Sequence, residues 1–599
     1  MKGKIGRGLA ATLLLAVGVA FDASAVKAKP GIIDYEQPDG SVIQLRLHGD
    51  ERSHYATSED GYLLIPNGEG GYEYAIENAQ GQPISSGIAA RPLSKRSAAE
   101  VNLLNNLDKE KLIESVRTRP TTGRRYAADN VDRKAVREDG TRYVYSTSVF
   151  PVKGEAPSLV ILVEYPDYGF SMDDPNEYYK RFLNGETFTD HGGTGSCRQY
   201  FIDNSMGQFK PNFDLYGPVM LKFNRSYYGS GDEYNAHNMV VEAVKALDPE
   251  VDFSIYDTNK DGYVDNVYII YANTGEADGG PESSVWPYSY ELELEGVRLQ
   301  ADGVKFNLYG CSNELTKGKP CGIGTFTHEF CHVLGLPDLY NTQKTDYSTP
   351  GDWSVLDGGP YNNDGRTPPC MSIFERYSLG WADCPEIVAS GDYIMEPVDV
   401  SNTGYMMTTE EKKTEFYMLE NRQKEGWDRY LPGHGMLVWH IDFVQRIWDF
   451  NAVNDRASHQ YVKLVCADNI ANGTSYSGDS YPGRTEKTEL STETEPRLES
   501  WLKTPLNVTK ISGIAENDGR ISFTAKLTEE RGPLPGKVES VAGLEGDLIL
   551  NGRTLQSTIE KSVDVYDLSG RKIGNIATSG ELQLEPGLYI AGGKKFVVR

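Results

Sequence analysis

The sequence is poor in histidine and cysteine, and after its first 25 residues it has no long apolar run. Nine histidines and seven cysteines occur among 599 residues. A membrane-spanning helix needs about 20 consecutive apolar residues, so this lack argues against a membrane span in the mature chain. The sequence also lacks blocks of like charge, which argues against a disordered interaction tail.

The charge balance is strongly acidic. Lys and Arg number 60 while Asp and Glu number 86, which gives a formal net charge of −26 at pH 7. This balance argues against nucleic acid as a partner and favours a soluble protein that can bind cations. A length of 599 residues favours several domains, and 62 glycines with 37 tyrosines favour many turns and a sizeable β content.

The first 25 residues are typical of a signal peptide. Lys2, Lys4 and Arg7 precede an apolar stretch, Leu9–Phe21, and Ala23–Ala25 forms an A-x-A cleavage site. A membrane anchor is the alternative, but the stretch is too short to span a bilayer comfortably. We therefore expect an exported protein, secreted or at the cell surface. Export permits disulfides, yet an odd number of cysteines leaves at least one thiol free or paired with another chain.

We interpret residues 26–147 as a propeptide. A turn at Asp39-Gly40 is followed by strand-like stretches up to about residue 88, and a helical apolar pattern covers residues 101–116. The basic pair Arg124-Arg125 offers a site for activation cleavage. The segment contains no cysteine and no cluster of metal ligands. The alternative is an N-terminal β domain that is never removed.

The rest of the chain predicts a multidomain α+β protein. Residues 148–385 mix a buried strand at 159–163 with helical patterns at 177–184, 197–203 and 237–247. Residues 386–528 are rich in strand patterns. A linker with Pro and Gly, residues 529–545, precedes a small strand-rich module, residues 546–599.

The most informative stretch is an H-E-x-x-H motif that begins at His328. Residues four apart lie on one face of a helix, so His328 and His332 can bind one zinc ion, with Glu329 beside the metal but not bound to it. Gly335 ends the helix and can turn the chain so that Asp338 becomes the third ligand, which leaves a fourth position for water. The alternative for Asp338 is a partner that orients a histidine.

This arrangement favours hydrolysis of peptide bonds. Zinc lowers the pKa of a bound water to about 7, and Glu329 as general base takes its proton so that the water attacks the scissile carbonyl. Glu329 then returns the proton to the leaving amine. The alternative is a buried helix whose two histidines are merely hydrogen-bonded. Cys331, on another face of the helix, is expected to be a packed thiol or half of a disulfide.

On these residues the chain resembles the immune inhibitor A family of secreted bacterial metallopeptidases. The family pattern is similar to H-E-x-x-H-x-x-G-x-P-D, the form of residues 328–338. The resemblance covers roughly residues 155–527 and implies a metzincin-like zinc core followed by a β-rich domain, with Glu329 as general base and a propeptide over the cleft. It implies zinc ligands His328, His332 and Asp338. Similar stretches elsewhere are Arg198–Phe201, Asn204–Phe209, Gly275–Ala277, Trp286–Pro287, Glu420–Arg422 and Gly433–Asp442.

The chain departs from the wider metzincin pattern at two positions. The third ligand there is histidine, whereas this chain has Asp338, as in the immune inhibitor A family. A methionine usually lies beneath the metal, and the corresponding position here is Leu356, which can still form an apolar floor. Tyr361 follows closely and could reach the oxyanion.

A calcium site is predicted at residues 257–265, which resemble an EF-hand loop with Gly262 at the turn. Position 12 is Tyr268 instead of glutamate, and residues 267–271 predict a strand instead of a helix. The alternative is an Asp- and Asn-rich turn without calcium. The expected oxygen ligands at positions 1, 3, 5, 7 and 9 are Asp257, Asn259, Asp261, the Tyr263 carbonyl and Asp265.

Residues 546–599 resemble the C-terminal sorting domain of type IX secretion. The resemblance lies in Val563–Lys572, Pro586–Ile590 and Lys594–Arg599. It implies export through the periplasm and contact with the secretion machinery. The alternative is a β module that only caps the preceding domain.

Together these features predict a secreted zinc-dependent endopeptidase that acts on proteins or peptides. The other hypothesis is a surface-binding protein with little or no catalysis that keeps a structural metal site. Glu329 favours the enzyme, because a structural site has no use for a base beside an open coordination position.

Overall fold

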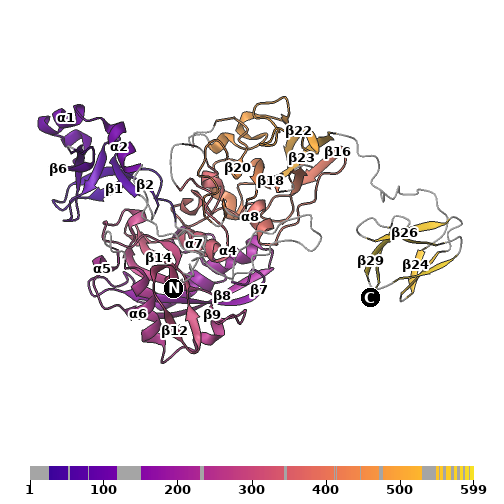
Figure 1. Ribbon diagram of the computed structural model, residues 1–599, viewed down its shortest axis with the longest axis horizontal. Helices are drawn as coiled ribbons and strands as arrows, with labels where there is room; N and C mark the ends of the chain where they lie inside the picture. The colour runs from indigo at the N-terminus through magenta and orange to yellow at the C-terminus, as the bar shows by residue number, and fades with distance from the viewer. Residues whose placement is uncertain are drawn as a thin grey trace, which may run out of the picture. The chain divides into compact units, whose positions relative to one another are not determined.

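A computed structural model describes residues 26–528 and most of residues 548–598 (Figure 1). The predicted signal peptide, the Arg124-Arg125 pair and the linker 529–545 lie outside the described residues. The chain divides into two compact units, one ending at Lys526 and the other made of Val388–Ser390 with Leu527–Arg599. Residues not described within the two ranges are 51–53, 79, 118–149, 230–234, 343–346, 348, 410–411, 413, 445–446, 449, 471–475, 552, 558–561, 568–571, 577–579, 585–586 and 592–593.

Residues 33–117 form a six-stranded antiparallel meander with two short helices. Leu45 and Tyr74 are buried in its core and pack with Leu104 of the first helix. The helical pattern predicted at residues 101–116 corresponds to two helices instead of one. The Asp108 side chain accepts a hydrogen bond from the Lys111 amide and so caps the start of the second helix. The elements are β1 (Ile33–Glu36), β2 (Val42–Gly49), β3 (His54–Ser58), β4 (Leu63–Pro66), β5 (Tyr72–Glu77), β6 (Pro83–Ala89), α1 (Ala98–Asn105) and α2 (Lys109–Arg117).

The centre of the first unit is a mostly parallel sheet of order β11-β14-β10-β7-β8, with β15 paired to β14. β11 is an antiparallel strand at one edge. A smaller sheet contains β12, β13 and β9. The strands are β7 (Gly154–Glu164), β8 (Phe209–Met220), β9 (Tyr263–Val264), β10 (Val267–Thr274), β11 (Tyr288–Glu291), β12 (Leu299–Ala301), β13 (Val304–Phe306), β14 (Leu308–Thr316) and β15 (Lys319–Pro320).

Alternate residues of β7 pack against helices on the two faces of this sheet. Leu159, Ile161 and Val163 share a buried cluster with residues of α6. Val160 and Leu162 belong to a second cluster, which includes residues of α3, α4 and α7. Burial on both faces explains the continuous apolar run predicted as a strand. The helices of this region are α3 (Pro175–Asn184), α4 (Cys197–Asn204), α5 (Arg225–Gly229), α6 (His237–Leu247), α7 (Gly324–Val333) and α8 (Ile373–Ser378).

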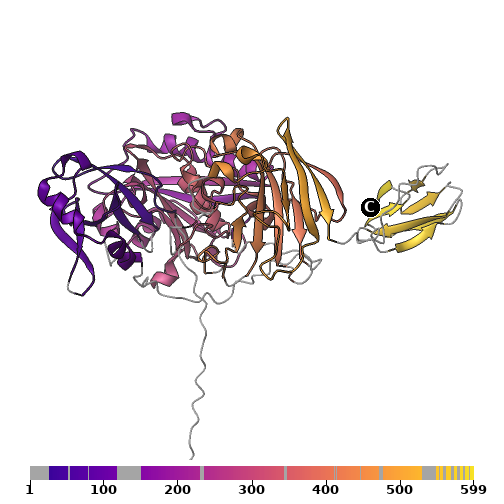
Figure 2. The ribbon, with the colours of Figure 1, turned by 90° about the horizontal axis from the view of Figure 1, so that it is seen from above.

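Residues 391–527 form two four-stranded sheets, of order β16-β23-β22-β21 and β17-β18-β19-β20 (orange strands in Figure 2). The strand content agrees with the sequence patterns of this region. Its strands are β16 (Gly391–Met395), β17 (Tyr405–Thr408), β18 (Glu415–Arg422), β19 (Gly435–Asp442), β20 (Val462–Leu464), β21 (Glu489–Ser491), β22 (Val508–Asn517) and β23 (Arg520–Leu527).

A fully buried arginine, Arg422, ties these strands to residues 353–373. Its guanidinium donates to both carboxylate oxygens of Asp428, at 2.6 and 2.7 Å. It also donates to the carbonyl oxygens of Trp353 at 3.2 Å and Cys370 at 3.0 Å. Glu420 accepts a further hydrogen bond from Arg422 at 3.2 Å and one from the Ile373 amide at 2.6 Å. The Glu420–Arg422 motif therefore holds two parts of the chain together.

The second unit contains a small β module within residues 548–598. It has two sheets, of order β24-β25-β28 and β27-β26-β29-β30. Leu555, Val565 and Ile576 are buried in a common core. The strands are β24 (Leu548–Asn551), β25 (Thr554–Ser557), β26 (Val563–Asp567), β27 (Lys572–Ile576), β28 (Glu581–Gln583), β29 (Gly587–Ala591) and β30 (Lys594–Val598).

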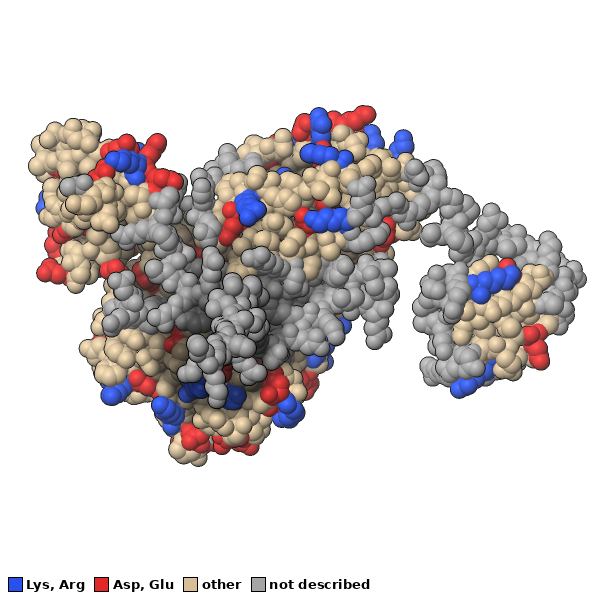
Figure 3. Space-filling model, in the orientation of Figure 1, with Lys and Arg blue, Asp and Glu red and all other residues tan. Residues whose placement is uncertain are grey.

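Helices and strands in several sheets confirm the predicted α+β class. No helix in the described part of the chain has the length and apolar character needed to cross a membrane. Acidic and basic side chains are interspersed on the face shown in Figure 3. The seven cysteines all lie in the described part of the chain, and no disulfide joins any two of them.

Candidate metal centre and active site

Helix α7 carries the H-E-x-x-H residues. Its Phe326 and Phe330 pack in the buried cluster on one face of the central sheet, and this packing fixes the rotation of the helix about its axis. His328 and His332, four residues apart, therefore lie together on one side of the helix. The first residue of the helix is Gly324, where a side-chain carbon would lie only 1.9 Å from the Pro360 carbonyl oxygen. The helix is therefore held close to the chain around residue 360.

Gly335 turns the chain so that Asp338 meets the two histidines. Its φ of +85° lies in the left-handed region that favours glycine. Asp338 Oδ1 lies 3.2 Å from His328 Nε2 and 3.3 Å from His332 Nε2. Among the described residues, this is the one group of three or more His, Cys, Asp or Glu side chains whose ligand atoms all lie within 4.8 Å of one another.

Backbone carbonyls hold the far side of each imidazole ring. His328 Nδ1 lies 2.7 Å from the Val355 carbonyl oxygen, and His332 Nδ1 lies 2.7 Å from that of Leu336. A carbonyl oxygen only accepts, so each Nδ1 carries the proton and each Nε2 keeps its lone pair. Both lone-pair nitrogens lie beside Asp338, which is the arrangement that a metal ligand pair requires.

Asn451 holds Asp338 from behind, and sequence reasoning missed it. The Asp338 amide donates to Asn451 Oδ1 at 2.7 Å, and Asn451 Nδ2 donates to Asp338 Oδ2 at 2.6 Å. Asn451 follows Asp338 by 113 residues, and no local sequence signal connects the two.

The donor set fits a zinc ion. Two imidazole nitrogens and one carboxylate oxygen are a known ligand set for a catalytic zinc with an open position. Asp338 Oδ1 is buried and has no hydrogen-bond partner among the described residues. A buried carboxylate oxygen in this state is costly unless a cation lies against it.

A short segment of the N-terminal region lies against Glu329. The Val26 backbone nitrogen donates to Glu329 Oε1 at 2.8 Å, and this contact is buried. The Trp286 indole donates to the Val26 carbonyl at 2.9 Å, and the Tyr361 hydroxyl donates to the Lys27 carbonyl at 2.7 Å. Tyr361, expected near the oxyanion, is thus in contact with a peptide backbone beside the metal centre.

Leu356 and Cys331 are both buried, as expected. Leu356 is held on both sides, since its amide donates to Ser354 Oγ at 3.0 Å and its carbonyl accepts from the Leu339 amide at 2.8 Å. Burial raises the pKa of the Cys331 thiol well above its usual range. Cys331 is outside the histidine group and is a packed thiol.

The loop at residues 257–265 does not bring three acidic side chains together as the metal centre does. Asp257 accepts hydrogen bonds from the amides of Asp261 at 3.0 Å and Gly262 at 3.1 Å. Burial raises the pKa of Asp265 to about 6. Hydrogen bonds from Thr258 lower this pKa, whereas the negative charges of Asp261 and Asp257 raise it further. The strand predicted after the loop is β10, so a helix-loop-helix is absent here.

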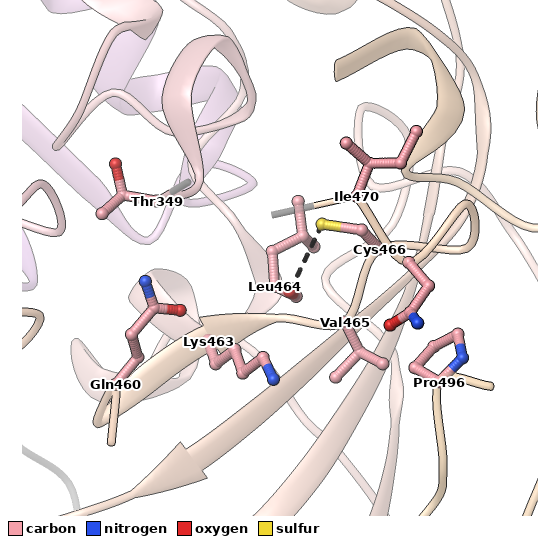
Figure 4. A pocket seen from close by; sticks show the side chains of 9 residues that line it. Thr349, Gln460, Lys463, Leu464, Val465, Cys466, Ile470 and Pro496 are labelled. Atoms are coloured by element: carbon pink, nitrogen blue, oxygen red, sulfur yellow. Dashed lines mark hydrogen bonds between the residues drawn. The ribbon is translucent and has the colours of Figure 1, made fainter. Parts of the chain in front are cut away.

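A separate pocket contains a half-buried thiol (Figure 4). Its lining includes Thr349, Lys463, Cys466 and Pro496. Cys466 Sγ donates to the Leu464 carbonyl at 3.6 Å, and burial raises the pKa of this thiol well above its usual range. A thiol kept neutral is a poor nucleophile, so the pocket has no evident chemistry of its own.

Comparisons with known proteins identify the domain around this site. Residues 155–379 match the family model described as immune inhibitor A peptidase M6, catalytic domain. The chain is 27% identical over 285 residues to immune inhibitor A of Bacillus thuringiensis subsp. alesti, which covers 38% of this chain and 41% of that protein. It is 24% identical over 267 residues to the pre-pro-metalloprotease PrtV of Vibrio cholerae, which covers 37% of this chain and 29% of that protein. The chain therefore spans less than half the length of these curated relatives.

Replacing Asn451 with alanine should weaken zinc binding about tenfold to a hundredfold. The reason is that Asn451 orients the Asp338 carboxylate and also accepts a hydrogen bond from the Asp338 backbone amide. Competition with a zinc chelator measures the affinity of the purified variant. The control Asn212→Ala removes only an exposed hydrogen bond to Asp214 and should bind zinc as the wild type does. Wild-type affinity in Asn451→Ala would contradict the role given to Asn451.

Proposed function

We propose that the protein is a secreted zinc-dependent endopeptidase that hydrolyses peptide bonds in proteins. The main support is the convergence of His328, His332 and Asp338 beside Glu329, within a domain that matches a peptidase catalytic domain. The names of the relatives, a pre-pro-metalloprotease and immune inhibitor A, agree with this activity. A metzincin-like arrangement of the core is part of the proposal.

Each residue of the site has its own role in the proposed reaction. His328, His332 and Asp338 would hold zinc, which when bound polarises the scissile carbonyl and lowers the pKa of a water molecule. Glu329 takes the proton of the attacking water and returns it to the leaving amine. Its Oε1 accepts from the Val26 nitrogen at 2.8 Å, so a main-chain nitrogen fits beside it.

Glu329→Gln should keep zinc and lose casein hydrolysis by about 10²- to 10⁴-fold. Zinc content and hydrolysis are measured on both proteins after removal of residues 26–147. Glu155→Gln, a change on an exposed part of β7, should leave both unchanged. Equal absence of hydrolysis in wild type and Glu329→Gln would instead favour the surface-binding protein with a structural metal.

Residues 26–147 would act as a propeptide that keeps the enzyme latent. If the signal peptide is cleaved after Ala25, the nitrogen against Glu329 becomes an α-amino group. Val26–Lys29 then occupies the place where substrate must lie, as the contacts with Glu329, Trp286 and Tyr361 support. The main-chain nitrogen of Val26 beside Glu329 is the contact that supports this arrangement.

An ion pair strengthens this attachment at moderate pH. His54 of β3 lies 2.9 Å from Glu276 Oε1, and its ring stacks on Trp286 with centroids 4.6 Å apart. Desolvation lowers the pKa of His54, but Glu276 outweighs this and raises it from 6.5 to about 9. Because the His54 side chain is 34% exposed, solvent screens part of this attraction. The charged pair therefore contributes fully below pH 6.5, and its contribution is lost as the pH rises through about 9.

The full-length protein should hydrolyse casein at least about tenfold more slowly than the protein trimmed of residues 26–147. Deleting only Val26–Lys29 should restore part of the activity, because residues 33–117 keep their own core while the cleft is vacated. Rates at pH 7 on equal amounts of zinc-loaded protein test this. Equal rates for full-length and trimmed protein would refute latency.

Calcium at residues 257–265 is proposed as a stabiliser of the catalytic domain. A chelator that removes calcium but spares zinc should lower the melting temperature, since calcium at 100 times its Kd would contribute about 2.7 kcal/mol. Asp257→Ala should abolish the dependence on calcium. An unchanged melting temperature after chelation would leave the loop as a turn without an ion, as its internal hydrogen bonds allow.

Export completes the proposal. The relatives' names support an extracellular protein, and the predicted signal peptide agrees. Periplasmic transit and sorting through residues 546–599 stay predictions from sequence resemblance. An export assay of a chain that ends before residue 546 tests them, since normal secretion of that chain would reject a sorting role.

A further inference from the structure

The segment Val26–Lys29 is bound in a defined direction. Val26 places its nitrogen on Glu329, and the chain then runs past Trp286 and Tyr361. In the proposed reaction, Glu329 returns a proton to the nitrogen of the first residue after the scissile bond. Val26 therefore stands where that residue (P1′) of a substrate lies. Lys27, Ala28 and Lys29 stand at P2′, P3′ and P4′.

The main-chain contacts of this segment with the catalytic region suit any extended peptide, whereas the Ala28 amide donates to the Gly49 carbonyl of the N-terminal region at 2.9 Å. The Trp286 indole and the Tyr361 hydroxyl bind carbonyl oxygens, and the Ala277 carbonyl accepts from the Lys29 amide at 3.1 Å. None of these contacts reads a side chain. On this side of the scissile bond, selection among substrates must therefore come from the groups that meet the side chains at P1′, P2′ and P4′.

The side chain at P2′ faces a buried acid. Lys27 Nζ lies 3.6 Å from Asp357 Oδ1, and the Asp357 side chain is fully buried whereas that of Lys27 is 28% exposed. Asp357 Oδ2 accepts from the Gly351 amide at 2.6 Å, but Oδ1 has no hydrogen-bond partner among the described residues. A buried carboxylate in this state favours a cationic neighbour. Asp357 directly follows Leu356, so the loop beneath the metal centre also places this acid.

The side chain at P4′ enters a second acidic site. Lys29 is only 6% exposed. Its Nζ donates to Thr316 Oγ1 at 2.8 Å and lies 3.7 Å from Asp278 Oδ1. Thr316 and Asn313 donate to the two Asp278 oxygens at 2.8 and 3.0 Å, which fixes the carboxylate. Asp278 directly follows Gly275–Ala277, one of the stretches that resemble the immune inhibitor A family.

We propose that the cleft selects protein substrates with lysine or arginine at P2′ and P4′, through Asp357 and Asp278. The inference rests on the proposed peptidase function. Both acids belong to the region that matches the catalytic domain, so they stay in the cleft when residues 26–147 are removed. The fully buried Val26 indicates an apolar residue at P1′. The substrate class is thus basic protein segments with an apolar residue after the cleaved bond.

A binding experiment tests the two acidic sites directly. The full chain without Val26–Lys29 is titrated with the free peptides Val-Lys-Ala-Lys, Val-Glu-Ala-Lys and Val-Lys-Ala-Glu in a calorimeter. Each lysine-to-glutamate change should weaken binding about tenfold or more. Asp357→Asn should remove the discrimination at the second residue only, and Asp278→Asn that at the fourth. Asp364→Asn, whose side chain is 58% exposed, is the matched control and should preserve both.

A cleavage experiment separates this inference from the proposed function. Octapeptides that differ only at P2′ are offered to the enzyme trimmed of residues 26–147. An about tenfold higher kcat/KM for lysine than for glutamate supports the inference. Equal kcat/KM values, or equal affinities of the three tetrapeptides, overturn it and leave the peptidase standing. Lysine-dependent binding with no cleavage of any peptide overturns the peptidase and leaves a basic-peptide-binding cleft. The comparisons among peptides need no substitution in the cleft of the protein, so they remain valid even if an Asp357 variant fails to fold.

Discussion

The proposed metal centre depends on one constraint, which is that each buried candidate ligand must be oriented by a partner behind it. His328 and His332 rely on the carbonyls of Val355 and Leu336, and Asp338 relies on Asn451. Without such partners the imidazoles could turn their protonated nitrogens inward and the carboxylate could rotate away. Three separate parts of the chain must therefore pack correctly before the three ligand atoms can converge.

This constraint gives the β-rich region a part in the chemistry. Asn451 comes from the chain after β19, and Arg422 of β18 binds the carbonyls of Trp353 and Cys370 on either side of the loop that carries Val355. Breaking such a buried ion network costs about 3–5 kcal/mol, which is a large share of a domain's stability. The β-rich region therefore does more than extend the fold. It holds the loop that carries Val355 and supplies the Asn451 side chain, and these two orient His328 and Asp338.

The sequence allowed the local parts of the site to be predicted and concealed the long-range ones. The histidine spacing, the turn at Gly335 and the buried β7 follow from helix and strand periodicity and from glycine's access to positive φ. Asn451 was missed because it lies 113 residues from Asp338, and contacts of that range have no periodic signal. The calcium loop shows the opposite case. Its spacing matches an EF-hand loop only up to position 9, and amides of the loop donate to the Asp257 oxygens, so spacing alone does not establish a cation site.

In the proposed peptidase, latency and substrate specificity are physically coupled in the cleft. The N-terminal segment blocks the site because it binds as a reaction product would. It therefore uses the same main-chain donors and the same acids as a substrate does. Its affinity therefore cannot be tuned independently, because any change at Asp357 that weakens a basic substrate also weakens the hold on Lys27. The ion pair between His54 and Glu276 adjoins these subsites but contacts none of the side chains of Val26–Lys29 in them. It can add to the affinity of the N-terminal region without altering substrate selection, and this separates the strength of inhibition from the choice of substrate.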